Sequence, residues 1–150
     1  MRVGDIMTKK VETISAGESL GAALERMRQR RIRHLVVMSG KKLAGIVSKR
    51  DLGALGREEG RVEDVMSAPA VSATADMTVR KAANLLRGRS VGCLPVMEDG
   101  DLVGIVTTTD LLERIGRGAE HPVSRGERWT LKGRGPRRKS VVGHKNVVAR

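Results

Sequence analysis

Two short stretches of the sequence place a hydroxyl side chain three residues before a carboxylate. Ser48 and Asp51 close the stretch GIVSKRD, and Thr107 and Asp110 close the stretch GIVTTTD. The repeated pattern could mark a pair of matched ligand sites, because an ionised carboxylate only accepts hydrogen bonds and can bind the donors of a ligand. The same spacing also fits a capping box, in which the hydroxyl and the acid satisfy free N–H groups at a helix start. The two interpretations are compatible, because a capping carboxylate can keep one oxygen for a ligand.

The residues between the hydroxyl and the acid differ in charge between the two stretches. Lys49 and Arg50 precede the first carboxylate, whereas two threonines, Thr108 and Thr109, precede the second. The first stretch is therefore better suited to neutralise a polyphosphate. Solvated surface side chains are the alternative interpretation for the two cations.

Both stretches belong to a longer internal repeat. Residues 2–52 align with residues 61–111 at a constant offset of 59 positions without a gap, and 17 of the 51 aligned positions are identical. A repeat of this length indicates that one supersecondary unit occurs twice. A unit of about 50 residues is marginal alone, so we expect the two copies to pack together.

Each copy predicts the same order of elements. Apolar residues at helical spacing predict one helix in each copy, at Leu20, Ala23, Leu24 and Met27 and at Val79, Ala82, Ala83 and Leu86. Two apolar runs joined by turn-forming residues follow each helix and predict a β-hairpin. A second helix starts at the hydroxyl of the opening motif. The predicted fold class is α+β, with two β-α-β-β-α repeats at 1–58 and 59–116 packed with pseudo-two-fold symmetry.

The excess of positive charge lies mostly at the C-terminus. Residues 117–150 contain 10 Lys or Arg against 2 Asp or Glu, which supplies +8 of the net charge of +12. This segment is rich in Gly and Arg and shows no sustained helical or strand period. We interpret it as a basic, mostly flexible extension that could bind nucleic acid or an acidic partner. A solvated tail, or a last strand formed by SVVGHKNVV, is the alternative.

The composition argues against several classes of protein. The chain has one Trp and neither Phe nor Tyr, so it lacks the aromatic platforms on which unpaired bases stack. Cys93 is the only cysteine and the three histidines are scattered, which predicts no disulfide and no metal site. Cys93 is interpreted as a small buried apolar residue. The sequence offers no set of nucleophile, base and orienting group, so we expect no enzyme. Neither a signal peptide nor a membrane span is recognised, which predicts a cytoplasmic protein without membrane contact.

The duplicated pattern resembles a tandem pair of CBS domains, the Bateman module. The resemblance is carried by DIMT and DVMS at the start of each copy, by LPV in the second, and by the Gly-apolar-apolar-Ser/Thr-x-x-Asp endings. It covers residues 2 to about 115. It implies adenine nucleotide binding in the cleft between the copies and a homodimer of four repeats. The implied nucleotide-binding residues are Ser48, Arg50, Asp51, Thr107, Thr109 and Asp110. Candidate phosphate contacts are Arg33, His34 and Lys49, with solvated side chains as the alternative.

The sequence therefore predicts a stand-alone regulatory module. We expect it to sense AMP, ADP, ATP or a related adenosyl ligand, without any other cofactor, and to modulate a separate protein that the sequence does not identify. The alternative is a dimeric interaction adaptor whose basic tail binds nucleic acid or an acidic protein.

Overall fold

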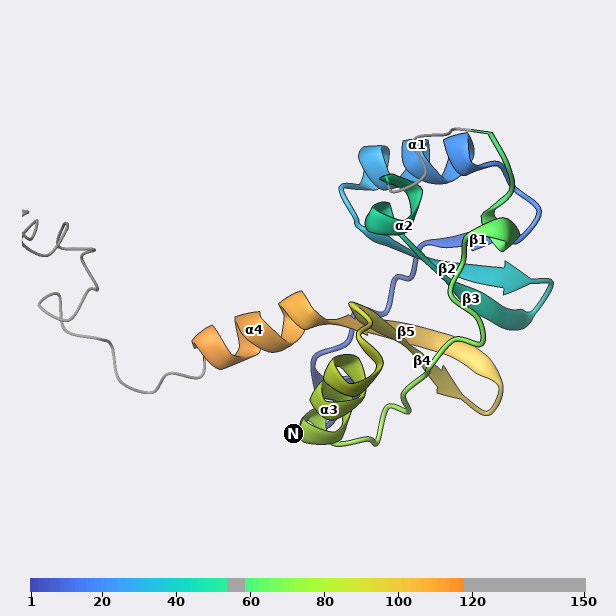
Figure 1. The fold of residues 1–150 in the computed structure, drawn as a ribbon. Helices are drawn as coiled ribbons and strands as arrows, with labels where there is room; N and C mark the ends of the chain where they lie inside the picture. Colours follow the sequence, from blue (N-terminus) through green and yellow to red (C-terminus); the bar gives the residue numbers. More distant parts are fainter. Residues whose placement is uncertain (54–58, 118–150) are drawn as a thin grey trace, which may run out of the picture. The chain divides into compact units, whose positions relative to one another are not determined.

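Each copy of the repeat forms a helix, a β-hairpin and a second helix, as the sequence predicts. The structure is a computed structural model that describes residues 1–53 and 59–117 (Figure 1). The elements of the first copy are α1 (Leu20–Arg30), β2 (His34–Ser39), β3 (Lys42–Ser48) and α2 (Lys49–Gly53). Those of the second copy are α3 (Val79–Arg89), β4 (Cys93–Glu98), β5 (Asp101–Thr107) and α4 (Thr108–Arg117). The mixed α/β fold with two repeats is confirmed. The predictions for the tail concern residues 118–150, which lie outside the described residues.

The predicted opening strand is complete only in the first copy. There, β1 (Thr13–Ser15) pairs in parallel with β2, and the N–H of Val36 donates to the carbonyl of Glu12 at 3.2 Å. The residue equivalent to Val36 in the second copy is Pro95, which has no N–H to donate. The strand is consequently reduced to a single parallel bridge between Ala73 and Val96.

The short segment that opens each copy packs against the other copy. The 3₁₀ turn η1 (Val3–Asp5) begins with the Val3 N–H donating to the carbonyl of Met77 at 2.8 Å. The equivalent turn η2 (Val62–Asp64) begins with the Val62 N–H donating to the carbonyl of Glu18 at 2.9 Å. Each folded half therefore takes its first residues from the other copy.

Two separate hydrophobic cores result from this exchange. Val62 belongs to the buried cluster of the first copy and Val3 to that of the second, and both side chains are fully buried. The glycine of each repeated motif permits the approach of these leading segments. A Cβ added to Gly45 would lie 2.7 Å from the carbonyl oxygen of Ser67, which is closer than nonbonded atoms tolerate. Within 1–53 and 59–117, no helix combines the length and the apolar character that crossing a bilayer requires.

Candidate functional site

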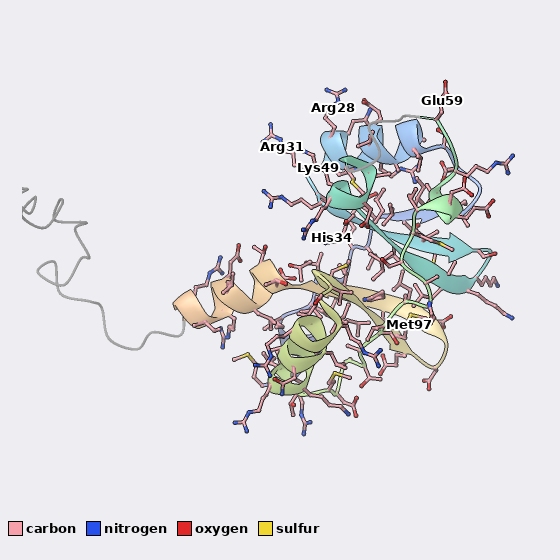
Figure 2. All side chains as sticks on the ribbon, in the orientation of Figure 1. Arg28, Arg31, His34, Lys49, Glu59 and Met97 are labelled. Carbon is pink, nitrogen blue, oxygen red and sulfur yellow. The ribbon has the colours of Figure 1, made fainter. Side chains whose placement is uncertain are left out.

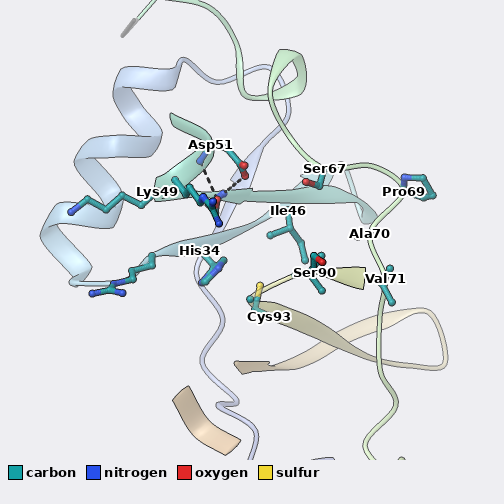
Figure 3. A pocket seen from close by; sticks show the side chains of 15 residues that line it. His34, Ile46, Lys49, Asp51, Ser67, Pro69, Ala70, Val71, Ser90 and Cys93 are labelled. Atoms are coloured by element: carbon teal, nitrogen blue, oxygen red, sulfur yellow. Dashed lines mark hydrogen bonds between the residues drawn. The ribbon is translucent and has the colours of Figure 1, made fainter. Parts of the chain in front are cut away.

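Residues from both copies of the repeat line a cavity of about 640 Å³ (Figure 3). This volume lies in the range of about 300 to 1,000 Å³ that is typical of small-molecule sites. The lining residues come from the start of β2, the end of β3 with α2, the segment after η2, and the start of β4. All six site residues predicted in the first copy line it, namely Arg33, His34, Ser48, Lys49, Arg50 and Asp51.

Ser48 and Asp51 form a reciprocal cap at the start of α2. The backbone N–H of Ser48 donates to Oδ2 of Asp51 at 2.9 Å, and the backbone N–H of Asp51 donates to Oγ of Ser48 at 3.1 Å. The capping interpretation is therefore confirmed for this pair. Within the described part of the chain, Oδ1 of Asp51 accepts no hydrogen bond and the Ser48 hydroxyl donates none. One acceptor and one donor remain for a ligand.

The wall opposite Asp51 is mostly apolar, with the hydroxyls of Ser67 and Ser90 in the same lining, and it comes largely from the second copy. Its apolar residues are Ile46 at the end of β3, Pro69, Ala70 and Val71 after η2, and Val91. Apart from Ile46 and Val91, these residues follow directly on the exchanged segment, so the exchange brings them opposite the cap. Sequence reasoning did not single them out. The signal that could have found them is the apolar run APAV after DVMS.

Three cations surround the cavity. Arg33, Lys49 and Arg50 are exposed, and none of them forms an ion pair with another residue in 1–53 or 59–117. The Lys49 side chain extends from α2 toward α1, away from Ile46 and Cys93 (Figure 3). The head of Lys49 therefore lies at the margin of the cavity.

The imidazole of His34 is half-buried in this site. Burial is the main cause that lowers its pKa, the charge of Asp51 raises it, and the charge of Arg33 lowers it further. The imidazole packs against Gly92, where an added Cβ would lie 2.6 Å from Nε2. His34 is consequently neutral at pH 7 and contributes shape and one hydrogen-bonding face.

Cys93, the counterpart of His34 in the second copy, is buried and behaves as the sequence predicts. Burial raises the pKa of its thiol to about 12. The thiol therefore stays protonated and lines the cavity as a small apolar group. Among the described residues, no group of three or more His, Cys, Asp or Glu side chains could hold a metal ion.

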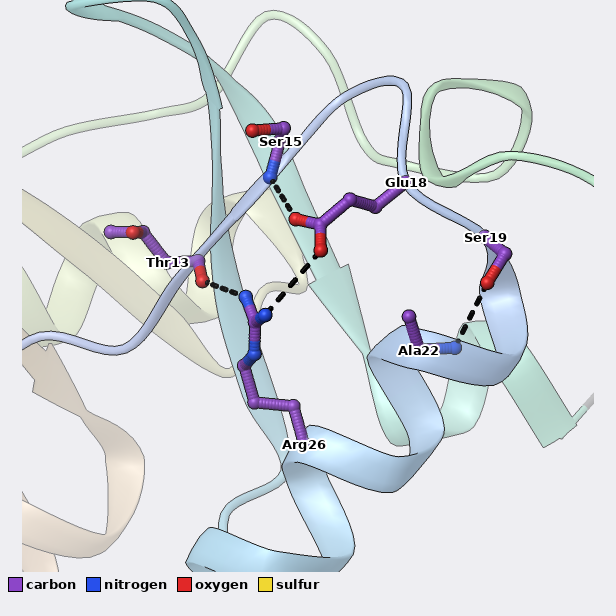
Figure 4. A network of polar contacts seen from close by, with 6 residues as sticks. All are labelled: Thr13, Ser15, Glu18, Ser19, Ala22 and Arg26. Carbon is purple, nitrogen blue, oxygen red and sulfur yellow. Dashed lines mark hydrogen bonds and ion pairs between the residues drawn. The ribbon is translucent and has the colours of Figure 1, made fainter.

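The other arginines of the stretch Arg26 to His34 do not reach the cavity. Helix α1 ends at Arg30, so Arg33 does not share a helical face with Arg26 and Arg30. Arg26 donates to the carbonyl of Thr13 at 2.6 Å and lies 3.4 Å from a Glu18 oxygen (Figure 4). Arg30 lies 3.4 Å from a carboxylate oxygen of Glu12. At the C-terminal end of α1, Arg28 and Arg31 extend outward, away from His34 (Figure 2).

The three site residues predicted in the second copy, Thr107, Thr109 and Asp110, do not line the larger cavity. Thr107 donates to Oδ2 of Asp110 twice, from its backbone N–H at 2.7 Å and from its hydroxyl at 2.9 Å, and its Oγ1 accepts from the Asp110 N–H at 3.2 Å. Asp110 lines a smaller cavity of about 220 Å³ beside Asp5 and Glu113. Binding by this second set stays a prediction.

Comparison with known proteins identifies both copies. The family model described as CBS domain matches residues 3–53 and 62–117. The CBS domain-containing protein YhcV of Bacillus subtilis is 31% identical over 114 residues, which are 73% of this chain and 81% of that protein. For three other curated relatives of 32 to 33% identity, the chain spans less than half of the relative's length.

Solved structures with bound ligands have the same fold. The CBS domain pair of protein MJ0100, in complex with 5′-methylthioadenosine and S-adenosyl-L-methionine, matches with a TM-score of 0.72 and 27% identity, covering 78% of this chain and 97% of that one. The cytosolic domain of the Mg²⁺ channel MgtE, in complex with ATP, matches with a TM-score of 0.65 and 28% identity, covering 75% of this chain and 48% of that one.

Proposed function

Since the chain belongs to the CBS-domain family, we propose that it is a regulatory module that binds an adenosyl ligand in the cavity at Asp51 and modulates a separate protein. The observation that carries this proposal is the free Oδ1 of Asp51 in a cavity whose opposite wall is mostly apolar. Such a cavity offers a charged acceptor for a ribose and an apolar surface for a base. Relatives of the same fold contain adenosyl ligands.

The expected pose follows from the hydrogen-bonding capacity of each group. The two ribose hydroxyls donate to Asp51, because an ionised carboxylate can only accept. The Ser48 hydroxyl donates to a ribose or phosphate oxygen, and adenine packs between Ile46 and Val71. Arg50 and Arg33 meet the phosphates of AMP, ADP or ATP, with Lys49 and His34 at the margin. Thr107, Thr109 and Asp110 remain the predicted residues of a second site.

The proposal includes assembly as a homodimer. On α4, the side chains of Leu112 and Ile115 are 63% and 72% exposed. Large apolar side chains this exposed are candidates for burial against a second copy. Binding in the cavity then changes the conformation or the assembly that the regulated protein meets.

The charge of the tail supports a second candidate function. Residues 117–150 contribute +8 of the net charge, so an adaptor that binds nucleic acid or an acidic protein through this segment is the alternative. Binding to a phosphate backbone weakens steeply with salt. A salt titration of nucleic-acid binding, measured with and without residues 117–150, distinguishes this adaptor function from nucleotide binding in the cavity.

The proposal is tested by removing the carboxylate and the diol, separately and together. Asp51→Asn should weaken the binding of an adenosyl ligand about 10- to 150-fold, since it loses charged hydrogen bonds worth about 1.5 to 3 kcal/mol. With the parent protein, 2′-deoxyadenosine nucleotides should bind more weakly than the ribonucleotides, because they lose one of the two hydroxyls that donate to Asp51. Since Asp51→Asn already weakens that contact, the variant should discriminate less between the two kinds of nucleotide than the parent does.

Isothermal titration calorimetry measures these affinities, and thermal unfolding without ligand checks the fold. Asp101→Asn, an exposed carboxylate of β5, is the control for removing one negative charge. Equal affinity of the parent and Asp51→Asn for all adenosyl ligands would refute the proposal.

A further inference from the structure

One contact between the two copies joins the imidazole of His34 to the backbone of Gly92. His34, which Figure 3 labels, is the first residue of β2, and Gly92 directly precedes β4. A Cβ added to Gly92 would lie 2.6 Å from Nε2 and 2.9 Å from Cε1 of the imidazole. The ring of the first copy therefore occupies the space that a side chain at position 92 of the second copy would need.

The backbone of Gly92 is in turn bonded to the start of α4. Its carbonyl accepts two hydrogen bonds from Thr108, one from the backbone N–H at 3.0 Å and one from the hydroxyl at 3.3 Å. Thr108 is the first residue of α4, the helix on which Leu112 and Ile115 are exposed. A displacement of Gly92 would weaken the bonds that hold the first turn of this helix.

The equivalent contact in the opposite direction lacks these features. At the repeat offset of 59, Cys93 takes the place of His34, and Arg33 takes the place of Gly92. The carbonyl of Arg33 accepts the backbone N–H of Lys49 at 2.8 Å, and Lys49 has no hydroxyl to add a second bond. The contact from the first copy to the second is therefore a distinct feature of this chain and not a consequence of the repeat.

The charges around His34 decide how a proton would affect its imidazole. Burial is the main cause that lowers the pKa of His34, the charge of Asp51 raises it, and the charge of Arg33 lowers it further. Lys49 and Arg50 of α2 line the same cavity and disfavour another positive charge nearby. A charged ring is consequently favoured only where it gains water or the carboxylate of Asp51.

The second copy offers no charge to a protonated ring in its closed position. Cys93 is the only titratable residue that it contributes to the cavity, and its thiol, with a pKa of about 12, stays neutral. Because burial against Gly92 disfavours the charged form of His34, protonation of the ring and its displacement toward water favour each other.

From this geometry we infer that His34 and Gly92 form a proton-sensitive contact, through which the charge state of the cavity and the order of the first turn of α4 affect each other. A neutral ring stays against Gly92 and keeps the carbonyl of Gly92 in place for Thr108. A charged ring leaves Gly92, and the start of α4 loosens. Acid thereby changes the helix that exposes Leu112 and Ile115. The inference goes beyond the proposed function, because it does not depend on a ligand.

The first test uses the reciprocity of such a coupling. Gly92→Ala displaces the ring and should raise the pKa of His34 toward 6.5, the value without burial. Proton NMR titration of the full chain measures this pKa, and His34→Asn distinguishes its signal from those of His121 and His144. Gly88→Ala, at an exposed position of α3 where an added Cβ would point into open space, is the control and should leave the pKa of His34 unchanged.

The second test measures amide exchange in the first turn of α4 by NMR, corrected for the intrinsic rate at each pH. Gly92→Ala should make these amides exchange roughly three- to tenfold faster, the effect of weakening one hydrogen bond. Combining it with His34→Ala should restore their protection, because the added methyl group then fits the space that the ring leaves. Acidifying the parent from pH 7.5 to pH 5.5 should act as Gly92→Ala does, and His34→Asn should abolish this response.

A further variant keeps the tests decisive if Gly92→Ala does not fold. Thr108→Val removes only the hydroxyl bond to Gly92 and should change both measurements in the same direction by a smaller amount. An unchanged pKa of His34 in the folded variants would overturn the inference. Protection of α4 that responds neither to acid nor to these variants would also overturn it. If the coupling is found and no adenosyl ligand binds, the proposed function fails and this inference stands.

Discussion

The first and second copies both end in a cap formed by a hydroxyl and a carboxylate, at Asp51 and at Asp110. Different residues surround the two caps. Both carboxylates accept the backbone N–H three residues earlier, at 2.9 and 2.7 Å. The first faces a mostly apolar wall and cations that have no ion pair within the described residues, and the second lies beside Asp5 and Glu113. Duplication conserves the local hydrogen bonds of the motif, because these depend on residues three positions apart. Ligand capacity depends on residues brought from the other copy, which have diverged.

The largest effect on stability is expected from changes in η1 and η2, the short segments through which each copy packs against the other. Val3→Ala and Val62→Ala each remove two buried methyl groups, which should lower the free energy of unfolding by about 2 kcal/mol. Because the segments are exchanged, Val3→Ala should weaken hydrogen-exchange protection of β4 and β5, and Val62→Ala that of β2 and β3. Chemical unfolding and exchange measured by mass spectrometry check both expectations.

Lys41→Ala, at an exposed position in the turn between β2 and β3, is the control and should change stability by less than about 0.5 kcal/mol. If Val3→Ala instead loosened β2 and β3, each leading segment would belong to its own copy and the exchange would be wrong.

A smaller effect is expected from acidification, and only the first copy should produce it. Burial lowers the pKa of His34 below its unfolded value of 6.5, so the unfolded chain binds a proton more readily than the folded one. The stability held by neutral His34 is complete above pH 6.5 and is lost as the pH falls through the folded pKa. Cys93, with a pKa of about 12, does not titrate in this range.

The measurement compares chemical unfolding of the parent and of His34→Asn at pH 7.5 and pH 5.5. The parent should lose more stability on acidification than the variant does. Equal losses would mean that other groups carry the pH dependence and that His34 is solvated in the folded protein.

Much of the fold could be predicted from local patterns. The stripes on α1 and α3, the two hairpins and both caps involve residues close in sequence, so the repeat was sufficient to predict them. The exchange could not be predicted, because Val3 and Val62 give the same apolar pattern whichever copy they pack against. The shortened strand of the second copy has a local cause, the missing N–H of Pro95, but its effect depends on the partner carbonyl across the sheet.

The candidate site likewise contains residues that the sequence predicted and residues that it did not. The motif residues Ser48 and Asp51 were predicted, and so was the location of Arg33, Lys49 and Arg50 around them. The wall formed by Pro69, Ala70 and Val71 was not predicted, since it faces Asp51 only after the two copies pack. The sequence distinguished the two motifs by the cations beside Asp51, but it did not predict the acidic neighbours of Asp110, because Asp5 comes from another segment and Glu113 from the following helix turn.

The most direct test of the central claim is a crystal structure of the full chain grown with ATP. The account predicts that ATP occupies the cavity lined by Asp51. Its ribose hydroxyls should lie within about 3.2 Å of the Asp51 carboxylate, its adenine against Ile46 and Val71, and its phosphates near Arg50 and Arg33. ATP bound at Asp110 with the Asp51 cavity empty, or bound with its ribose turned away from Asp51, would contradict it.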